Sequence, residues 1–294
     1  MVPAAGRPSA AHMTVIPLTA TTLPSGETIP VLGQGTWRLG QGRHPRAEEI
    51  DALRVGIDLG MTMIDTAEMY GDGASEQLVG EAIAGRRDDV FLIGKVLPEH
   101  ASRPGTIAAC EASLRRLGTD RLDLYLLHWR GPIALQETVA AFEELRGRGL
   151  VRHWGVSNFD LPDLLELRRV DGGTGVEADE VLYNLMHRAI EWDLLPWCLQ
   201  NGMPVIAYSP IEQGQLVGHP VLRFIAGKHK ATSAQVALAW VLRFPGVCAI
   251  PETGSPEHVR QNRAALDIEL DDEDLLKLDA AFPPPSMPQP LEVH

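Results

Sequence analysis

Short apolar runs alternate with amphipathic stretches almost from end to end of the chain, and this rhythm restricts the fold more than any other feature. Several runs are continuous, such as FLIG at 91–94, LYLL at 124–127 and VIAY at 205–208. Continuous apolar runs are typical of parallel strands that are buried on both faces. The stretches between them carry apolar residues at helical spacing. The sequence therefore predicts eight strand-and-helix units.

We expect the eight strands at residues 31–37, 61–67, 89–96, 122–128, 151–158, 176–182, 204–209 and 247–251. Helices are expected at 46–59, 75–84, 106–117, 135–146, 162–169, 193–201, 219–229, 233–242, from 256 onward, and 271–281. Ser75 and Ser233 are candidate N-caps. A turn signal at 24–26 predicts a small hairpin before the first strand, and the proline-rich segment 283–294 predicts an extended tail on the surface.

Two architectures accommodate such units, an open doubly wound sheet and a closed eight-stranded barrel. No GxGxxG fingerprint follows the first strand, where Gly33-Gln34-Gly35 is a bare GxG. Eight units in 294 residues favour the barrel. The predicted fold class is α/β, a (β/α)8 TIM barrel with an N-terminal β-hairpin and an extended C-terminal tail, and residues 14–294 form its single domain.

Residues 1–13 are expected to be an extension, either disordered or left over from cloning. Residues 1–12 are rich in Ala, Pro and Gly and have no apolar h-region, so they do not form a signal peptide. Three cysteines lie far apart in the sequence and form no CxxC pair, which fits a reducing cytoplasmic setting. The expected location is therefore the cytoplasm.

The chain carries 26 Lys and Arg against 39 Asp and Glu, a formal net charge of −13. An acidic chain lacks the basic surface that phosphate backbones require, so nucleic acid is not an expected partner. No apolar run reaches the roughly 18–20 residues of a membrane span. We expect a monomer or weak oligomer that takes a small molecule as its partner.

Polar side chains close several of the predicted strands, at the end of a barrel where active sites lie. Asp65 ends the second strand and Tyr70 follows it, Lys95 lies near the end of the third, and His128 ends the fourth. Each has a structural interpretation as well: a helix cap, a lysine that reaches solvent, or a core histidine. Four such residues at three strand ends favour a catalytic site.

This combination suits proton delivery to a carbonyl group. A free tyrosine has a pKa of about 10, and a nearby ammonium lowers it by favouring the phenolate. A carboxylate beside the lysine would orient the ammonium, and an imidazole could hydrogen-bond the substrate oxygen. The four groups could therefore polarise a carbonyl and protonate it as a hydride arrives.

Five motifs appear in one order along the chain: IDTAEMYG at 64–71, GKV at 94–96, LLHW at 126–129, GVSNF at 155–159 and AYSPIEQGQL at 207–216. They resemble the aldo-keto reductase superfamily over residues 23–282, with details similar to the bacterial branch of methylglyoxal and diketogulonate reductase-like enzymes. The resemblance implies a barrel that binds a nicotinamide cofactor without a Rossmann domain. It also implies Tyr70 as general acid, Lys95 and Asp65 as groups that tune its pKa, and His128 as the residue that orients the carbonyl.

The same resemblance implies a cofactor site in which Ser157 and Asn158 hold the carboxamide and Tyr208 stacks on the nicotinamide. Trp37 and Trp129 fall where family members line the substrate pocket, although packing at the barrel mouth explains either one equally well. No metal ligands are expected. The implied cofactor-binding residues are Thr36, Ser157, Asn158, Glu180, Tyr208, Ser209, Pro210, Ile211, Gln213, Gly214, Leu216, Pro251, Glu252, Thr253, Ser255, His258, Gln261 and Asn262.

Three positions depart from the family pattern. Glu180 stands where the family usually has glutamine, which removes an amide donor from the nicotinamide site. Glu252 stands where the motif after the last strand commonly has lysine, and His258 where many members have arginine. A lysine pairs with the 2′-phosphate of NADP, whereas a glutamate repels it and can accept from ribose hydroxyls. The resemblance thus implies NADP(H), and Glu252 predicts a weakened preference that admits NAD(H).

The leading hypothesis is an NAD(P)H-dependent carbonyl reductase that acts on aldehydes or small ketones. An alternative is a nucleotide-sensing binding or regulatory protein on the same barrel, because a fold does not fix a function. A metal-dependent hydrolase barrel would need clustered ligands such as HxH on the first strand. None of the ten histidines shows that spacing, which disfavours this third class.

Overall fold

The computed structural model describes residues 20–294, so the expected extension at 1–13 lies outside the described residues, as do residues 14–19 of the expected domain. The described chain opens with the antiparallel hairpin of β1 (Ala20–Thr22) and β2 (Thr28–Pro30). The predicted turn lies between these strands, and its Gly26 has φ +95°, a conformation that glycine adopts without steric cost. The predicted hairpin is confirmed.

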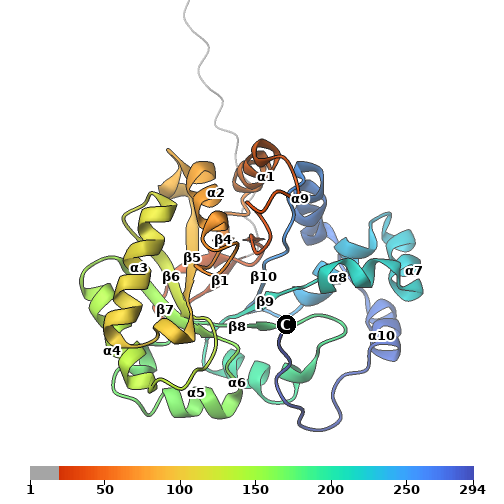
Figure 1. Ribbon diagram of the computed structural model, residues 1–294. Helices are drawn as coiled ribbons and strands as arrows, with labels where there is room; N and C mark the ends of the chain where they lie inside the picture. The colour runs from red at the N-terminus through yellow and green to blue at the C-terminus, as the bar shows by residue number, and fades with distance from the viewer. Residues whose placement is uncertain (1–19) are drawn as a thin grey trace, which may run out of the picture.

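Eight parallel strands form the barrel, and neighbouring strands in the sheet are consecutive in the chain (Figure 1). Isolated parallel bridges from Leu32 to Ala249 and from Gly35 to Glu252 join the last strand region to the first and close the ring. This confirms the predicted (β/α)8 class. The strands are β3 (Gln34–Gly35), β4 (Met63–Asp65), β5 (Phe91–Val96), β6 (Leu122–Leu127), β7 (Val151–Ser157), β8 (Asp179–Leu182), β9 (Val205–Tyr208) and β10 (Val247–Ala249).

Helices surround the strands in Figure 1, as the alternating sequence pattern predicts. They are α1 (Arg46–Asp58), α2 (Ala74–Ile83), α3 (Arg103–Leu117), α4 (Leu135–Gly147), α5 (Leu161–Leu167), α6 (Leu194–Gln200), α7 (Pro220–His229), α8 (Ser233–Val241), α9 (Pro256–Arg263) and α10 (Asp272–Ala281). Short 3-10 helices occupy loops at Arg87–Asp89, Pro98–His100, Gly173–Gly175, Ala189–Glu191, Glu212–Gly218 and Ala264–Asp267.

The two predicted serine caps are wrong by one or two residues. Gly73, with φ +84°, precedes α2, and the buried Ser75 hydroxyl donates instead to the Thr36 carbonyl oxygen at 2.9 Å. Thr232 caps α8 in a capping box with Gln235. A threonine followed three residues later by glutamine is the stronger N-terminal signal, so this cap was available in the sequence.

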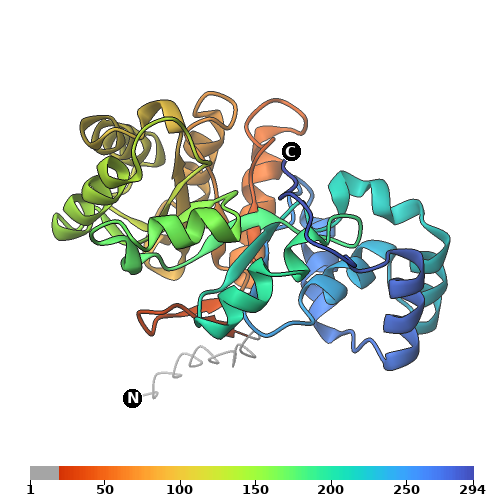
Figure 2. The same cartoon turned by 90° about the horizontal axis from the view of Figure 1, so that it is seen from below.

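The core has two layers. The larger cluster fills the space between strands and helices, and the smaller one fills the barrel interior with side chains such as Met63, Ile93, Leu124 and Ile206. Leu23 and Ile29 of the hairpin belong to this interior cluster and are 2% and 1% exposed. The hairpin therefore covers one end of the barrel, and Figure 2 shows it on the side opposite the C-terminus.

The three cysteines are free and buried, as expected of small apolar residues: Cys110 and Cys198 lie in the outer cluster and Cys248 in the interior. Burial raises the pKa of each thiol, to about 12 for Cys110 and for Cys248. Among residues 20–294, none of the helices has the length and apolar character of a membrane span.

The tail after α10 contains no helix or strand and is mostly exposed, as predicted for a proline-rich segment. Its end, however, turns back over the barrel. The His294 backbone N–H donates to the Tyr208 hydroxyl at 3.4 Å, and its imidazole lies 3.1 Å from Glu212. The expectation of a tail confined to the surface is therefore incomplete, because its last residue contacts the barrel mouth.

Strand β8 carries two acidic residues side by side, and both are buried. Successive residues of a strand point to opposite faces, so Glu180 faces the barrel interior and Asp179 faces the helical layer. Asp179 is 0% exposed, and neither of its side-chain oxygens has a hydrogen-bond partner among the described residues. Burial raises the pKa of Asp179 well above its ordinary value, and the charges of Asp160 and Asp163 add to the effect.

Replacing this carboxyl by an amide, Asp179→Asn, is expected to stabilise the fold at neutral pH, by about 1.4 kcal/mol for each pH unit over which the folded chain holds a proton that the unfolded chain has lost, because the amide is neutral without taking up a proton. The folded-state pKa lies above the unfolded-state value of about 3.9. Folding therefore takes up a proton, and this group's contribution to stability falls as pH rises from the unfolded-state pKa towards the folded-state pKa. Urea unfolding across that range should show a smaller pH slope for the variant.

Asp171→Asn makes the same chemical change at an exposed loop position. It should leave the free energy of unfolding within about 0.5 kcal/mol of the wild type. An Asp179→Asn variant that is less stable than the wild type would show that the carboxyl makes a favourable interaction.

Candidate active site

A buried ammonium group organises the carboxyl end of the barrel. Lys95, near the end of β5, is 0% exposed, and its Nζ donates to the Asp65 carboxylate, to the Tyr70 hydroxyl at 3.1 Å and to the Thr66 carbonyl oxygen at 3.2 Å. Asp65 ends β4, which pairs in parallel with β5, and Tyr70 lies in the loop that follows. The strand pairing thus brings three of the four predicted catalytic side chains into one hydrogen-bonded group.

The Lys95 ammonium stays charged although it is buried. Burial alone would lower the pKa of Lys95, but the Asp65 and Glu180 carboxyls outweigh burial and raise it above the ordinary value. Burial also raises the pKa of Asp65, and the charge and hydrogen bond of Lys95 oppose that rise. A buried charge persists only where it is paired in this way.

The pKa of Tyr70 shifts upward, whereas the sequence predicted a downward shift. Lys95 lowers it, as predicted, but burial raises it more, and Asp65 and Glu180 add to the rise, so the net shift is upward. The residue is only 9% exposed, and a buried phenolate would lose its hydration. The phenol therefore keeps its proton at neutral pH, which is the state that a proton donor requires.

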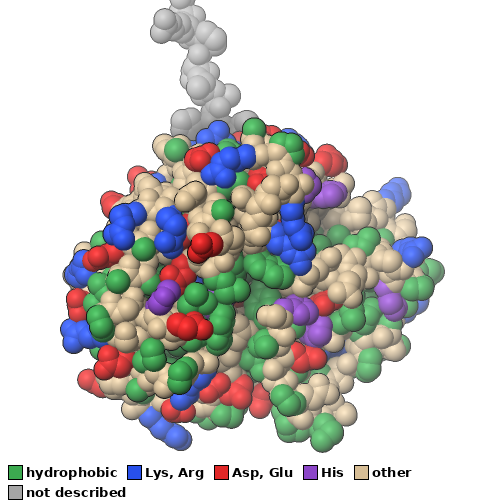
Figure 3. Space-filling view, viewed as in Figure 1, with side chains coloured by type: hydrophobic (Ala, Val, Ile, Leu, Met, Phe, Trp, Pro, Cys, Tyr) green, Lys and Arg blue, Asp and Glu red, His purple; other side chains and the backbone are tan. Residues whose placement is uncertain are grey.

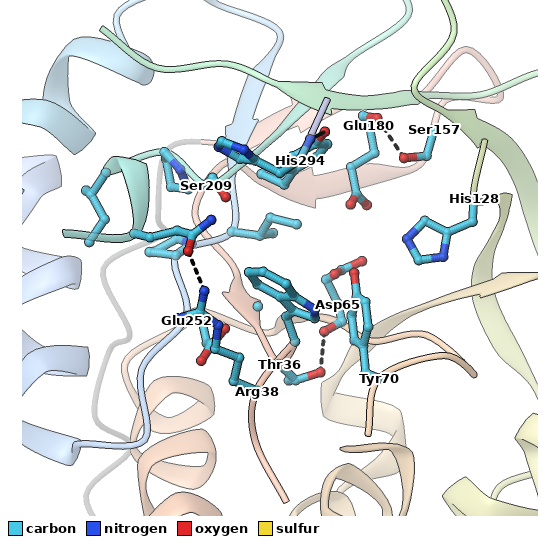
Figure 4. Close-up of a pocket in the computed structure, with 18 of the residues that line it drawn as sticks. Thr36, Arg38, Asp65, Tyr70, His128, Ser157, Glu180, Ser209, Glu252 and His294 are labelled. Atoms are coloured by element: carbon cyan, nitrogen blue, oxygen red, sulfur yellow. Dashed lines mark hydrogen bonds between the residues drawn. The ribbon is translucent and has the colours of Figure 1, made fainter. Parts of the chain in front are cut away.

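His128 completes the predicted set. Its ring lies edge-on to Tyr70 with centroids 5.8 Å apart, and 4.9 Å from the ring of Trp129. Burial lowers the pKa of His128 to about 3, and the charge of Lys95 contributes to the shift. The imidazole is therefore neutral across the physiological range and offers one N–H donor, beside the Tyr70 hydroxyl (Figure 4).

The next strands contribute neutral polar groups. The Ser157 hydroxyl donates to the Glu180 carbonyl oxygen at 2.8 Å, and the Asn158 amide donates to the His128 carbonyl oxygen at 3.1 Å. The Tyr208 hydroxyl donates to the Asn158 side-chain oxygen at 2.8 Å. Asn158 has φ +58°, a strained conformation of the kind that clusters at functional sites. These contacts hold the side chains at the ends of β7 and β9 in fixed positions.

A cavity of about 310 Å³ opens at this end of the barrel, within the size range of ligand pockets. Figure 3 shows it as a hollow whose visible walls are largely apolar. Its walls include most of the predicted site residues: Thr36, Trp37, Asp65, Tyr70, His128, Trp129, Ser157, Asn158, Glu180, Tyr208, Ser209, Pro210, Ile211, Gln213, Gly214, Pro251 and Glu252. Lys95 lies behind this wall and reaches it through Asp65 and Tyr70.

Six of the predicted cofactor-binding residues do not line this cavity: Leu216, Thr253, Ser255, His258, Gln261 and Asn262. Leu216 and Asn262 are buried, at 2% and 5% exposure. Thr253 and Ser255 precede α9, and His258 and Gln261 lie within it; the Thr253 hydroxyl is 3.5 Å from the His258 ring. Glu252 lines the cavity and directly precedes Thr253. The four residues of this segment therefore extend from the edge of the cavity and do not enclose it.

Five cavity residues were missed by the sequence interpretation: Gly35, Arg38, Met69, Ile250 and His294. Arg38 had a signal, because it is a cation beside Trp37 after the first barrel strand. It stacks on that ring at 4.3 Å and hydrogen-bonds Gln213 across the mouth, as the dashed line in Figure 4 marks. His294 had none, since a proline-rich tail does not indicate where it returns.

The returning tail brings three potential metal ligands together among the described residues. His187 and His294 both approach the buried Glu212 carboxylate, at 3.3 Å and 3.1 Å, and the donor atoms lie within 4.8 Å of one another. The Asn184 amide also donates to this carboxylate, at 2.7 Å. The carboxylate therefore already has hydrogen-bond partners, and the cluster serves to fasten the tail.

Comparison with known proteins identifies the family of this chain. Residues 31–282 match the family model described as Aldo/keto reductase family. The chain is 51% identical over 263 residues to methylglyoxal reductase YeaE of Escherichia coli K12, covering 88% of this chain and 93% of that protein. It is 35% identical to glyoxal reductase of Bacillus subtilis 168, covering 88% and 91%.

A solved structure is equally similar. The aldo/keto reductase from Klebsiella pneumoniae, crystallised in complex with NADP and acetate, superposes with a TM-score of 0.92 at 48% identity and covers 94% of this chain and 100% of that chain. The chain therefore belongs to the aldo/keto reductase family and is an NAD(P)-dependent oxidoreductase.

Proposed function

We propose that this enzyme uses NADPH to reduce small aldehydes and ketoaldehydes of the methylglyoxal type, with Tyr70 as the general acid. The observation that carries the proposal is the hydrogen-bonded set of Tyr70, Lys95 and Asp65 at the cavity wall. The names of two relatives, methylglyoxal reductase and glyoxal reductase, support the substrate class. The comparisons favour an enzyme, and no observation favours the nucleotide-sensing alternative.

The cavity fits the nicotinamide end of the cofactor. The Tyr208 ring stands at its wall, and Ser157 and Asn158 bring a hydroxyl and an amide to the same side. Glu180 adds a buried carboxyl oxygen that has no hydrogen-bond partner among the described residues. We propose that these four residues hold the carboxamide-bearing ring, which when bound supplies the hydride.

The roles of the catalytic side chains follow from their protonation states. The neutral His128 imidazole donates to the carbonyl oxygen and fixes its position. The Tyr70 hydroxyl gives its proton to the same oxygen as negative charge develops there, and Lys95, 3.1 Å away, stabilises the resulting phenolate. Asp65 holds the ammonium in place. Proton donation by a positioned side chain contributes about 10²–10⁴-fold to a rate.

The cavity also indicates a small substrate. Trp37 and Trp129 line it together with Met69, and they leave apolar walls around the catalytic hydroxyl. A volume of about 310 Å³ must also admit the reacting end of the cofactor, so little space remains for a bulky carbonyl compound. We propose that the two tryptophans form the wall against which a short-chain substrate packs.

Glu252 has neighbours that the sequence did not indicate. Burial raises the pKa of its carboxyl, while the charges of Arg38 and Arg43 lower it. These arginines partly compensate the negative charge at the cavity edge, so NADP(H) remains the proposed cofactor, as bound in the Klebsiella structure. The Glu252 carboxyl still weakens the attraction for a 2′-phosphate. We therefore propose that the enzyme also binds NAD(H) measurably.

We also propose a cytoplasmic location, which the three free cysteines support. Disulfides are rare in that compartment. A monomer or weak oligomer that binds neither nucleic acid nor membrane remains the prediction from charge and hydropathy.

Removing one hydroxyl tests the general acid. Tyr70→Phe should lower kcat for methylglyoxal reduction by about 10²–10⁴-fold and leave the Kd for NADPH nearly unchanged, because the hydroxyl serves only the proton step. Tyr125→Phe is the matched control, since that buried hydroxyl lies outside the cavity and has no partner. Full activity in Tyr70→Phe would refute the assignment.

Reversing one charge tests the cofactor end. Glu252→Lys should shift the ratio of the Kd values for NADH and NADPH by about tenfold or more towards NADPH, because the lysine would attract the 2′-phosphate. Fluorescence titration of both cofactors measures it, with Glu269→Lys as the control at an exposed position. A wild-type preference for NADPH of about a hundredfold or more would contradict the predicted weakening by Glu252.

A further inference from the structure

A second carboxyl joins the Lys95 group from across the barrel. Glu180 on β8 is 2% exposed, and its Oε1 lies 3.4 Å from the Lys95 ammonium. Its other oxygen, Oε2, is buried and receives no hydrogen bond from any described donor. The nearest charged groups are therefore one ammonium and two carboxyls, Asp65 and Glu180, and two ionised carboxyls would leave the group with a net charge of −1.

The two carboxyls cannot both be ionised without cost. Both approach the same Lys95 ammonium, and burial raises the pKa of Glu180, with the charge of Asp65 adding to the rise. One ammonium compensates only one of two buried carboxylates, so the second carboxyl is favoured in its neutral, protonated form. Asp65 also accepts from Lys95, which favours the ionised form there. The proton is therefore favoured on Glu180.

We propose that Asp65 and Glu180 share one proton beside Lys95, so that Glu180 is a neutral acid with the reduced cofactor and ionises to favour the oxidised cofactor. The proposal rests on the proposed function, since it assumes that the cavity takes a nicotinamide ring. The oxidised ring is positively charged and the reduced ring is neutral. A carboxylate at the cavity wall therefore stabilises only the oxidised form.

The surroundings of Glu180 determine how readily the proton leaves. Lys95 of β5 favours ionisation, and Asp65 of β4 opposes it. Tyr70 and Tyr208 face the same group, and both carry their protons because burial raises the pKa of each. A proton lost by the pair goes to solvent. When binding releases one proton, the binding constant changes by at most tenfold per pH unit.

The binding constants test this coupling without any turnover. We measure the Kd of NADPH and of NADP+ by quenching of tryptophan fluorescence from about pH 6 to about pH 9. In the wild type, the ratio of Kd for NADPH to Kd for NADP+ should rise with pH, by up to about tenfold per unit. In Glu180→Gln, which keeps the shape and removes the proton, the ratio should stay flat.

Asp179→Asn is the matched control, because it replaces the neighbouring buried carboxyl on the other face of the strand. It should keep the wild-type slope. An infrared difference spectrum between Asp179→Asn and the double variant Asp179→Asn/Glu180→Gln should show the C=O band of one protonated carboxyl. Equal slopes in the wild type and Glu180→Gln, or no such band, would overturn the proposal.

A measurement on the wild type alone keeps the test independent of how the variant folds. NADP+ binding in weakly buffered solution at neutral pH should release a fraction of a proton, and NADPH binding should release less. Equal release by the two cofactors overturns the shared proton. Failure to bind either cofactor instead overturns the proposed function, so the two failures are distinguishable.

Discussion

A fully buried ammonium is the constraint on which the rest of the site depends. Lys95 lies inside a barrel whose other interior side chains are largely apolar, and such a charge is tolerated only with close partners. Asp65 supplies the opposite charge, Thr66 supplies a carbonyl oxygen, and Tyr70 supplies a hydroxyl. The same requirement explains the pKa shifts, because each neighbour responds to the charge and to the loss of water around it.

The fold and the catalytic group could be predicted because they follow from patterns of short range. Parallel strands place their carboxyl ends at one edge of the sheet, so residues that end consecutive strands, such as Asp65, Lys95 and His128, must lie close together. The hairpin also had a local signal in its turn residues. Where two local signals competed, as at Thr232 and Ser233, the stronger capping motif determined the helix start.

Other features depend on distance in space and had no local signal. The approach of Glu180 to Lys95 joins β8 to β5 and depends on how these strands face each other across the barrel interior. The upward shift of the Tyr70 pKa depends on how much water the pocket excludes, which no spacing shows. The return of the tail to Tyr208 and Glu212 depends on contacts between segments that are more than 80 residues apart.

The hairpin at the closed end of the barrel bears on how protons move. Leu23 and Ile29 pack into the interior cluster, so on that side apolar side chains separate the Lys95 group from solvent. Among the described residues, the cavity at the mouth, where the ligands also enter, is the open side of the Asp65 and Glu180 carboxyls. A proton that the pair loses on cofactor binding must therefore leave through the mouth, so proton exchange and ligand entry share one route.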